Sequence, residues 1–387
     1  MGLLGKEEGL DPLTKTGGVL LLRYIAGSQD DFKKMLTMVW TASKYFEHSL
    51  GILLRGHGLS SYEDMVQLGV MKKKYIPYSA YMATISAYPL LSRIASRQHL
   101  LSTILAKMAL ILSIKVLDNI NDTYHTTEEA VDSLQRQAAA LISGNYIDRH
   151  VYTPVTRAEN SCILLASLVN KWLKTVVPAS KTSSKLFLDD LKTYIDGQCG
   201  TFLQQNTAQR NKLTIHDYLR RINEKGVGRI WVGLDLCMME QLCGENKKTL
   251  TGFNLIRKGF DYVFKSSNYY DDVADLEADL DSGIWNSVVY LGLEMGLLQK
   301  PEDALKCIKV KKMTINLGDL HYLIGLCYLK RVSDYLPINE KSLLASMAVF
   351  RFFTARKWFF KSLNLLNFVE FLKSKVPDEL HPYVKYI

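Results

Sequence analysis

Residues 268–281 read NYYDDVADLEADLD and carry six acidic side chains and no basic one. The chain as a whole has a formal net charge of +9, so this concentration of negative charge is unusual for it. Apolar residues recur at spacings of three and four on both sides, which predicts one helix from Leu250 to Asp281, closed by Gly283. The acidic side chains are therefore expected near the C-terminal end of a helix.

On that helix Asp271, Asp275 and Asp279 would form one stripe, with Asp272 beside it. Like charges four residues apart each cost about 0.2–0.5 kcal/mol, and the helix dipole at this end favours cations by about 0.3–1 kcal/mol. Bound divalent cations would reverse the sign of both effects, and Mg²⁺ prefers carboxylate oxygens, waters and substrate phosphates. The segment predicts a metal site, and a solvated acidic helix end is the alternative.

A second acidic pair lies in the sequence LDNIND, where Asp118 and Asp122 are four residues apart. They close an apolar helix that the spacing predicts to run from Tyr81. Thr126 and Glu129 have the spacing of a capping box, so a new helix is expected to begin just after the pair. The pattern D-x-x-x-D alone is more typical of a helix end with capping side chains, and only the two acidic segments together favour a metal site.

A third segment, YLRRINEKGVGRIW at residues 218–231, offers several cations for an anionic ligand. Arg221, Lys225 and Arg229 are the candidates, and the alternative is a basic helix without a ligand. The G-x-G within this segment is too short for a nucleotide-binding fingerprint. No H-E-x-x-H or G-x-S-x-G pattern occurs, so zinc and serine-hydrolase chemistry have no support.

The composition fits one large all-α domain over residues 1–387, since apolar residues make up 48% and no long Pro/Gly/Ser-rich stretch forms a linker. Alternating, strand-like patterns are few. Further helices are predicted at Phe32–Leu54, Tyr81–Leu117, Glu128–Ile142, Asn160–Val176, Leu186–Gln205, Tyr218–Cys243, Gly283–Gly296, Pro301–Lys309, Leu317–Tyr335 and Leu343–Leu372.

Other features bound the location and partners of the protein. The six cysteines are scattered singly and the first residues lack a secretory signal, so a cytoplasmic location with reduced thiols is expected. The apolar run Leu100–Leu117 contains two lysines, which fits a buried helix better than a membrane span. The Lys and Arg residues form no dense block, so nucleic acid is not expected as a partner. The basic and aromatic segment 350–361 leaves two alternatives, a buried helix or peripheral membrane contact.

The three segments together resemble the class I isoprenoid synthase superfamily, which comprises trans-prenyltransferases, squalene and phytoene synthases and class I terpene synthases. The pattern N-x-x-D-D-x-x-D at residues 268–275 resembles the second aspartate-rich motif of trans-prenyltransferases. D-N-I-N-D at residues 118–122 is more similar to the D-x-x-x-D of squalene and phytoene synthases than to D-D-x-x-D. Lys225 resembles the lysine of the family's Lys-Thr segment, although Gly226 stands where threonine is usual.

This resemblance covers residues 100–296 and leaves residues 301–387 as additional C-terminal helices. It implies a helical bundle around a central apolar cavity and Mg²⁺ as cofactor, with three ions around the bound diphosphate. Lys225 would bind the diphosphate together with Arg221 and Arg229, and departure of that group would generate an allylic carbocation. The expected metal ligands and catalytic residues are Asp118, Asp122, Asp271, Asp272 and Asp275.

The resemblance leaves the product open. The first motif favours a terpene synthase acting on farnesyl or a longer prenyl diphosphate. The second motif lacks N-D-x-x-S-x-x-x-E and is closer to that of a chain-elongating enzyme. The alternatives are an elongating or head-to-head prenyltransferase and, from another class, a noncatalytic helical module that binds lipid or protein. A homodimer is also left open.

Overall fold

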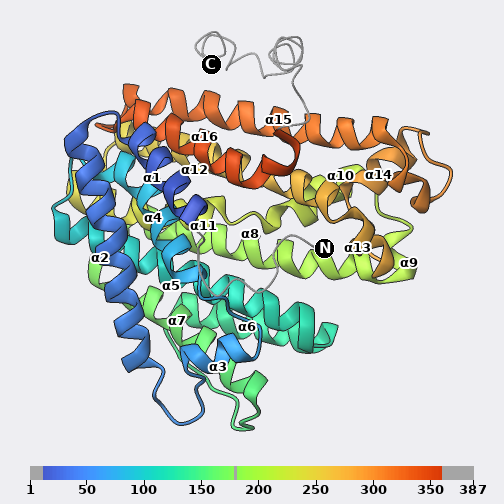
Figure 1. The fold of residues 1–387 in the computed structure, drawn as a ribbon, viewed down its shortest axis with the longest axis horizontal. Helices are drawn as coiled ribbons and strands as arrows, with labels where there is room; N and C mark the ends of the chain where they lie inside the picture. The colour runs from blue at the N-terminus through green and yellow to red at the C-terminus, as the bar shows by residue number, and fades with distance from the viewer. Residues whose placement is uncertain (1–11, 178–180, 360–387) are drawn as a thin grey trace. The chain divides into compact units, whose positions relative to one another are not determined.

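The computed structural model describes residues 12–177 and 181–359, and every regular element in those ranges is a helix (Figure 1). The all-α prediction is confirmed. Contacts divide the chain into two compact units, which are described separately below, while the single-domain organisation stays a prediction. Unit 1 comprises Met1–Leu188, Gly233–Glu245 and Pro337–Ser346, and unit 2 comprises Asp189–Val232, Asn246–Leu336 and Met347–Ile387. Three helices contribute residues to both units, namely α8 (Thr182–Gln205), α11 (Gly228–Cys243) and α16 (Glu340–Phe359).

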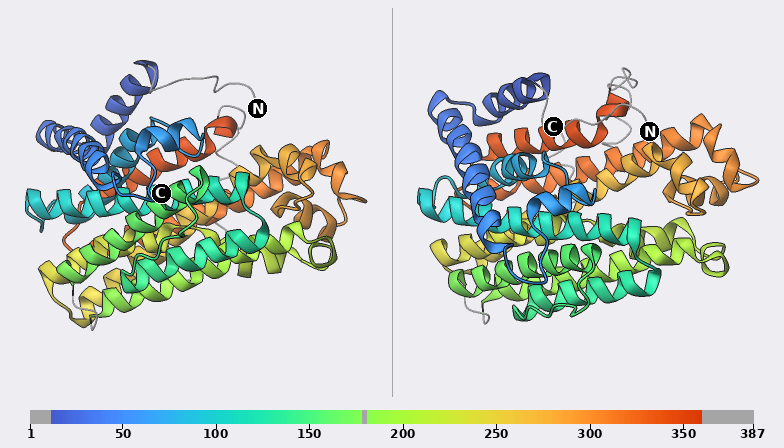
Figure 2. Two further views of the ribbon diagram at one scale, coloured as in Figure 1. Left: turned by 90° about the horizontal axis from the view of Figure 1, so that it is seen from below. Right: turned by 60° about the horizontal axis from the view of Figure 1, so that its bottom comes forward.

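Unit 1 is organised around the long helix α5, which packs against α2, α4, α6 and α7. Helix α1 packs on α2 at the edge of this unit, as the views in Figure 2 also show. All six cysteines of the chain are unpaired. The helices of unit 1 are α1 (Pro12–Ala26), α2 (Gln29–Leu53), α3 (Tyr62–Gln67), α4 (Tyr75–Leu91), α5 (Arg97–Tyr124), α6 (Thr127–Ser143) and α7 (Pro154–Val176).

The prediction of one unbroken helix from Tyr81 to the acidic pair is wrong, because α4 ends at Leu91 and α5 begins at Arg97. Ser96 caps the new helix by accepting a hydrogen bond from the backbone N–H of His99 at 3.2 Å. Residues 92–99 read SRIASRQH, in which only Ile94 and Ala95 are apolar, so the sequence carries a signal of this break that the prediction missed. The capping box after α5 is confirmed at the start of α6.

Lys107 lies fully buried in the middle of α5. Its Nζ donates to Ser86 Oγ at 2.9 Å and pairs with the carboxylate of Asp235, which is also fully buried. Burial lowers the pKa of Lys107 and raises the pKa of Asp235 to about 6, and the attraction between the two charges opposes both shifts. Among the described residues α5 is the one helix long and apolar enough to cross a membrane, yet 72% of its most apolar window is buried. The prediction of a buried helix here is confirmed.

Unit 2 is built on α12, which packs along α15 over much of its length. The two helices approach closely at Gly259 and Gly325, where an added Cβ on Gly259 would lie 2.5 Å from the Leu329 side chain. The elements that lie wholly in unit 2 are α9 (Thr207–Arg210), α10 (Ile215–Asp217), the π-helical turn η1 (Tyr218–Ile222), η2 (Asn223–Lys225), α12 (Lys247–Ala274), α13 (Leu276–Asp281), α14 (Ser287–Glu294), η3 (Pro301–Leu305), α15 (Ile308–Lys330) and η4 (Val332–Asp334).

The prediction of a single helix from Leu250 to Asp281 is also wrong, because α12 ends at Ala274 and α13 begins at Leu276. The carbonyl of Asp272, which a continuous helix would offer to the N–H of Leu276, accepts the side-chain amide of Asn286 at 2.8 Å. Gly283, with φ +72°, follows the end of α13, so the predicted stop signal is confirmed.

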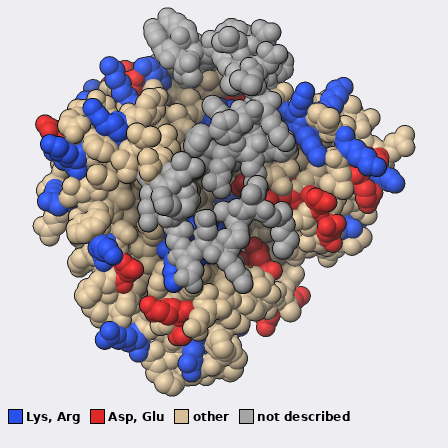
Figure 3. Space-filling model, in the orientation of Figure 1, with Lys and Arg blue, Asp and Glu red and all other residues tan. Residues whose placement is uncertain are grey.

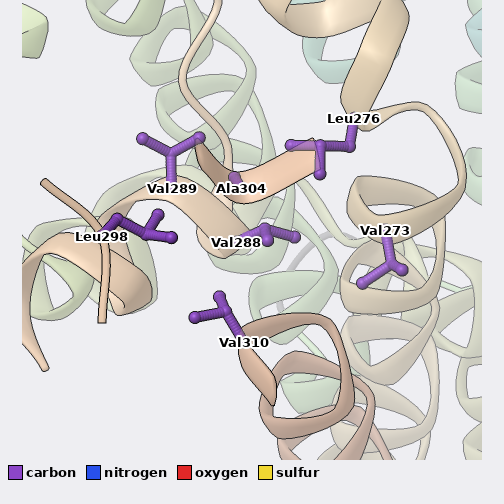
Figure 4. Close-up of a cluster of buried hydrophobic side chains, with 7 residues drawn as sticks. All are labelled: Val273, Leu276, Val288, Val289, Leu298, Ala304 and Val310. Carbon is purple, nitrogen blue, oxygen red and sulfur yellow. The ribbon is translucent and has the colours of Figure 1, made fainter. Parts of the chain in front are cut away.

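A buried apolar cluster holds the chain on both sides of this break (Figure 4). Its side chains come from the end of α12, the start of α13, α14, the loop that follows α14, η3 and α15, and Figure 4 shows them converging between these elements. The cluster fixes the turn between α12 and α13 against α14. Its members are Val273, Leu276, Val288, Val289, Leu298, Ala304 and Val310.

The segment with two alternatives, 350–361, lies largely outside the described residues, since side chains from 352 onward are not described. The two side chains that are described face the interior. The ring of Phe350 stacks on Phe264 with centroids 4.4 Å apart, and Arg351 pairs with the carboxylate of Asp319. Arg351 therefore does not belong to an exposed basic surface.

Candidate functional site

Two acidic side chains, Asp271 and Asp275, are exposed at the C-terminal end of α12. Asp275 is the C-cap residue, and its N–H donates to the carbonyl of Asp271 at 2.8 Å, so the two lie one helical turn apart. Asp279 belongs to α13, and the predicted stripe that joined it to these two residues is therefore wrong. The turn between α12 and α13 leaves two carboxylates together at a helix end that favours cations.

Asp272 lies beside them in sequence but is buried, with 7% of its surface exposed. Its Oδ2 accepts the N–H of Ser287 at 3.0 Å and also the Ser287 hydroxyl. Because Ser287 is the first residue of α14, the carboxylate occupies a helix N-terminus, where negative charge is stabilising. This oxygen of Asp272 is engaged in holding α14 to α12, and a metal-binding role for the residue stays a prediction.

Asp279 forms part of the same region through its Oδ2, which accepts from Asn286 Nδ2 at 2.7 Å. Burial, with the negative charges of Asp272 and Asp275, raises the pKa of Asp279 to about 6. Glu277 and Asp281, by contrast, are exposed. The sequence reasoning missed the roles of Asn286 and Ser287, which the preference of Asn for the residue before a helix could have indicated.

Lys225 ends η2 and is half-buried. Its positive charge opposes the rise in the pKa of Asp279, so the lysine and the acidic segment share one region of unit 2. Among the residues that the structure describes, Lys225 has no hydrogen-bond or ion-pair partner. Its ammonium group is therefore available to an anion in this region.

The two arginines named with it lie in different surroundings. Arg221 is exposed and sits 3.9 Å from a carboxylate oxygen of Asp217, a contact that contributes little. Arg229 donates to Asp261 at 2.7 Å and lies 3.7 Å from Glu224, so its guanidinium is committed to carboxylates of its own unit. The diphosphate role proposed for both stays a prediction.

Tight packing places the η2 segment. An added Cβ on Gly197 of α8 would lie 2.3 Å from the backbone nitrogen of Lys225, and one on Gly228 would lie 2.4 Å from the carbonyl oxygen of Phe260. These glycines allow backbone to approach backbone, which agrees with giving the G-x-G no phosphate-binding role. The π-helical turn η1 precedes this contact, and such turns are frequent at functional sites.

A chain of hydrogen bonds joins η2 to α12 and α15. Asn268 Nδ2 donates to Asn223 Oδ1 at 2.6 Å, and Asn223 Nδ2 donates to the hydroxyl of Tyr269 at 3.0 Å. The Tyr269 hydroxyl lies 3.4 Å from Nε2 of His321, whose Nδ1 is 3.0 Å from the carbonyl oxygen of Leu317. Burial lowers the pKa of His321 to about 4, so the ring is neutral near pH 7, with Nδ1 as donor. Asn268, the first position of the acidic motif, is thereby fixed.

A pocket of about 430 Å³ opens beside this chain within unit 2. Lys265 bridges two of its acidic residues, at 2.6 Å from Glu224 and 3.2 Å from Asp261. The pocket is charged, so the apolar cavity that the resemblance implies is a different space and stays a prediction. Its lining residues are Leu219, Asn223, Glu224, Arg229, Lys258, Asp261, Tyr262, Lys265, His321 and Tyr328.

The first acidic pair lies in the last two turns of α5 in unit 1. Asp118 is partly exposed and contacts Lys115 at 2.7 Å, and Asp122 is exposed. The asparagines between them are engaged in the fold. Asn119 Nδ2 donates to the carbonyl of Val70 at 2.8 Å, and Asn121 Oδ1 accepts from the Ser133 hydroxyl at 2.8 Å.

The donor types of both regions fit magnesium. Within the described ranges no three His, Cys, Asp or Glu side chains gather closely enough to hold a metal by themselves. Mg²⁺ usually takes only one or two carboxylates and completes its octahedron with waters and substrate phosphates. The exposed pair Asp271/Asp275, and the pair of the partly exposed Asp118 with the exposed Asp122, offer carboxylates of this kind. On the face shown in Figure 3, basic and acidic side chains are interspersed, without an extended field of one sign.

No protein-family model matches the chain, and no curated relative was found. Solved structures resemble it at low identity. The linalool/nerolidol synthase of Streptomyces clavuligerus, in complex with 2-fluorogeranyl diphosphate, is 15% identical, with a TM-score of 0.42 over 83% of this chain and 98% of that one. The geranylgeranyl pyrophosphate synthetase of the archaeon Geoglobus acetivorans is 12% identical, with a TM-score of 0.48 over 82% and 99%.

Proposed function

We propose that this protein is a Mg²⁺-dependent class I terpene synthase that ionises a prenyl diphosphate of farnesyl length or longer. The observation that supports this most is the end of α12, where two exposed carboxylates one turn apart occur in the same region as the half-buried Lys225. Carboxylates would bind the metal ions and the lysine would bind phosphate oxygens, so together they suit a metal-bound diphosphate.

In this proposal Asp271 and Asp275 are metal ligands in unit 2, and Asp118 and Asp122 are metal ligands in unit 1. Bound Mg²⁺ would act as a Lewis acid that stabilises the departing diphosphate. Lys225 would fix the orientation of the diphosphate oxygens through its ammonium group, because the fold leaves that group without a partner among the described residues. Asp272 would act by positioning, since it ties α14 to the end of α12.

The alternative within the same chemistry is a prenyltransferase that extends or couples its substrate. It is favoured by D-D-x-x-D at residues 271–275, which is closer to elongating enzymes than to common terpene synthases. The alternative from another class is a noncatalytic helical module. It is favoured by the engagement of Asp272, Asn119 and Asn121 in the fold, because motif residues with structural contacts can persist without catalysis.

The three alternatives are separated by the products of one incubation series. The purified protein is mixed with Mg²⁺ and geranyl, farnesyl or geranylgeranyl diphosphate, with and without isopentenyl diphosphate, and extracts are analysed by chromatography and mass spectrometry. A terpene hydrocarbon or alcohol formed without isopentenyl diphosphate is the expected result. A longer diphosphate that requires isopentenyl diphosphate would identify an elongating enzyme, and no product with any substrate would favour the noncatalytic module.

A matched pair of variants guards against contaminating activity. Asp275→Ala should abolish the product, because it removes an exposed carboxylate of the proposed metal site. Asp281→Ala removes another exposed carboxylate, six residues further on and outside the motif, and should leave the product unchanged. Equal activity of the two variants would sink the assignment of the site.

A further inference from the structure

Large apolar side chains are unusually exposed on α1 and α2 in unit 1. Among the described residues sixteen such side chains are exposed, and eight of them lie on these two helices. Single exposed apolar residues are ordinary, whereas a concentration of this kind usually marks an interaction surface. The eight are Val19, Leu20, Tyr24, Leu36, Trp40, Tyr45, Ile52 and Leu53.

On α1 the most exposed of them point away from the core. Leu20 and Tyr24 are 65% and 64% exposed and lie one turn apart, on the side opposite the buried Leu22. Helix α1 packs chiefly on α2, and a hydrogen bond from the Tyr81 hydroxyl to the Gly18 carbonyl at 3.2 Å ties it to α4. The outward face of α1 is not used for packing within unit 1.

The same arrangement occurs on α2. Leu36 and Trp40 lie one turn apart on the side opposite Ala42, which is fully buried, and Trp40 is 66% exposed. Lys33 lies seven residues before Trp40 and Lys44 lies four residues after it, so both lie on the same face of the helix as Trp40. Both lysines are exposed. A tryptophan flanked by lysines is typical of helices that lie in a lipid headgroup region.

Basic side chains continue onto α1, where Arg23 is exposed between Leu20 and Tyr24. One acid interrupts the α2 face, since Glu47 lies 3.4 Å from Lys44, but both side chains are more than half exposed and the pair contributes little. Asp31 is turned inward, with its Oδ1 accepting from the Tyr88 hydroxyl at 2.7 Å. The exposed face therefore combines apolar and cationic groups.

The length of α1 excludes a membrane span. Its apolar stretch Thr16–Ala26 has eleven residues, which is about 16 Å of helix at about 1.5 Å per residue. A bilayer core is about 30 Å thick, so this stretch can lie on the surface of a membrane but cannot cross it. An amphipathic pair of helices at the edge of a unit is suited to such a position (Figures 1 and 2).

We propose that the outward faces of α1 and α2 form a docking surface for an anionic lipid bilayer. Charge favours this occupant over a second copy of the chain. In a two-fold dimer the same patch faces itself, so Lys33, Lys44 and Arg23 would be removed from water against a surface that carries the same three cations. Anionic headgroups would instead neutralise these cations while Trp40, Leu36, Leu20 and Tyr24 enter the boundary between headgroups and acyl chains.

This proposal goes beyond the proposed reaction and does not depend on it, because none of these residues belongs to the acidic regions. It is tested by flotation of the full chain with phosphatidylcholine vesicles prepared with and without phosphatidylglycerol. The expected result is flotation with the anionic vesicles and weaker binding as salt is raised, since salt screens the lysines and the arginine. Failure to bind either type of vesicle would overturn the proposal.

Substitutions on the outward faces of α1 and α2 test whether these faces bind the vesicles. The double variant Leu20→Ser/Trp40→Ser should weaken binding by at least about ten-fold, because it removes the two most exposed apolar anchors. Lys33→Gln/Lys44→Gln should remove the preference for anionic vesicles. The matched control is Ile147→Ser/Val151→Ser, which changes side chains that are 60% and 69% exposed in the loop between α6 and α7, and it should bind as the unaltered protein does.

Two results would contradict the assignment of the surface. Equal loss of binding in the control would show that any exposed apolar pair suffices. The second result would come from sedimentation analysis without lipid, which measures the oligomeric state. Circular dichroism checks that each variant is folded. A dimer that Leu20→Ser/Trp40→Ser converts to a monomer would assign the surface to a second copy of the chain.

Discussion

The two acidic regions use their polar residues in opposite ways. At the end of α5 the aspartates Asp118 and Asp122 reach the surface while the asparagines beside them bind backbone and side chains of unit 1. At the end of α12 the aspartates themselves differ in burial, since Asp271 and Asp275 are exposed and Asp272 is buried against Ser287. A motif interpreted as one set of ligands is in each case divided between exposed candidate ligands and residues engaged in the fold.

Helices α5 and α12 are also held in place by different contacts, a buried ion pair in α5 and the bonds of Asp272 to Ser287 in α12. The largest effect on stability is expected from the ion pair. Lys107→Met in α5 would leave Asp235 buried without its partner, and we expect it to lower the free energy of unfolding by about 3–5 kcal/mol. Denaturant unfolding followed by circular dichroism measures the loss. Lys107→Met combined with Asp235→Leu should recover much of it, and a double variant as unstable as the single one would contradict the pairing.

The exposed aspartates of α12 should matter for turnover and not for stability. We expect Asp271→Asn and Asp275→Asn each to lower the rate of diphosphate release by about 100-fold or more, which corresponds to about 2.7 kcal/mol of transition-state stabilisation. Thermal unfolding should change little, because neither side chain is buried. A variant that keeps its rate would remove that residue from the proposed metal site.

Asp272 should show the opposite pattern. Asp272→Ala leaves the Ser287 N–H and hydroxyl without their buried acceptor, and we expect the free energy of unfolding to fall by about 2–3 kcal/mol. Ser287→Ala removes only the hydroxyl and should cost less. If Asp272→Ala melted with the unaltered protein while losing activity, the residue would belong with the ligands.

Asp118 provides the matching test in the other region. Its ion pair with Lys115 involves side chains that are 37% and 47% exposed, so Asp118→Ala should change the free energy of unfolding by less than about 1 kcal/mol. Loss of turnover without loss of stability is the expected result. Retained turnover would restrict the functional site to the end of α12.

The last effect expected is a pH dependence of stability from Asp279. Its pKa in the folded protein is about 6, above the unfolded value of 3.8, so the folded state binds the proton more tightly. This carboxyl therefore favours folding at pH 4 and loses that contribution as the pH rises through 6. Asp279→Asn should flatten this part of the profile, which thermal melts from pH 4 to 7 of both proteins would measure. A parallel pair of profiles would contradict the raised pKa.

The sequence predicted the helical class, the capping box before α6 and the stop at Gly283, because these follow from local periodicity and backbone chemistry. It missed the breaks within the two long helices. Ser96 caps a helix within residues 92–99, SRIASRQH, and this local signal was missed. Asn286 binds the Asp272 carbonyl from fourteen residues away, and that contact depends on tertiary structure, which spacing does not encode.

The candidate site shows the same limit. Spacing located Asp271, Asp275 and Lys225, and the structure places the end of α12 and η2 in one region of unit 2. Which carboxylate would be buried depended on α14, whose N-terminus selects Asp272. The commitment of Arg229 to Asp261 likewise arises from residues far apart in the chain. The chemistry assigned to these residue types stays a prediction, and which of the like residues are buried could be seen only in the fold.

The central claim is that the protein ionises a prenyl diphosphate with the help of Mg²⁺ held at the end of α12. The most direct test is the release of inorganic diphosphate from farnesyl diphosphate, measured with Mg²⁺, with excess chelator, and for Asp271→Asn/Asp275→Asn. We predict release only for the unaltered protein with Mg²⁺. Release that continues in the presence of chelator, or in the double variant at the unaltered rate, would contradict the claim.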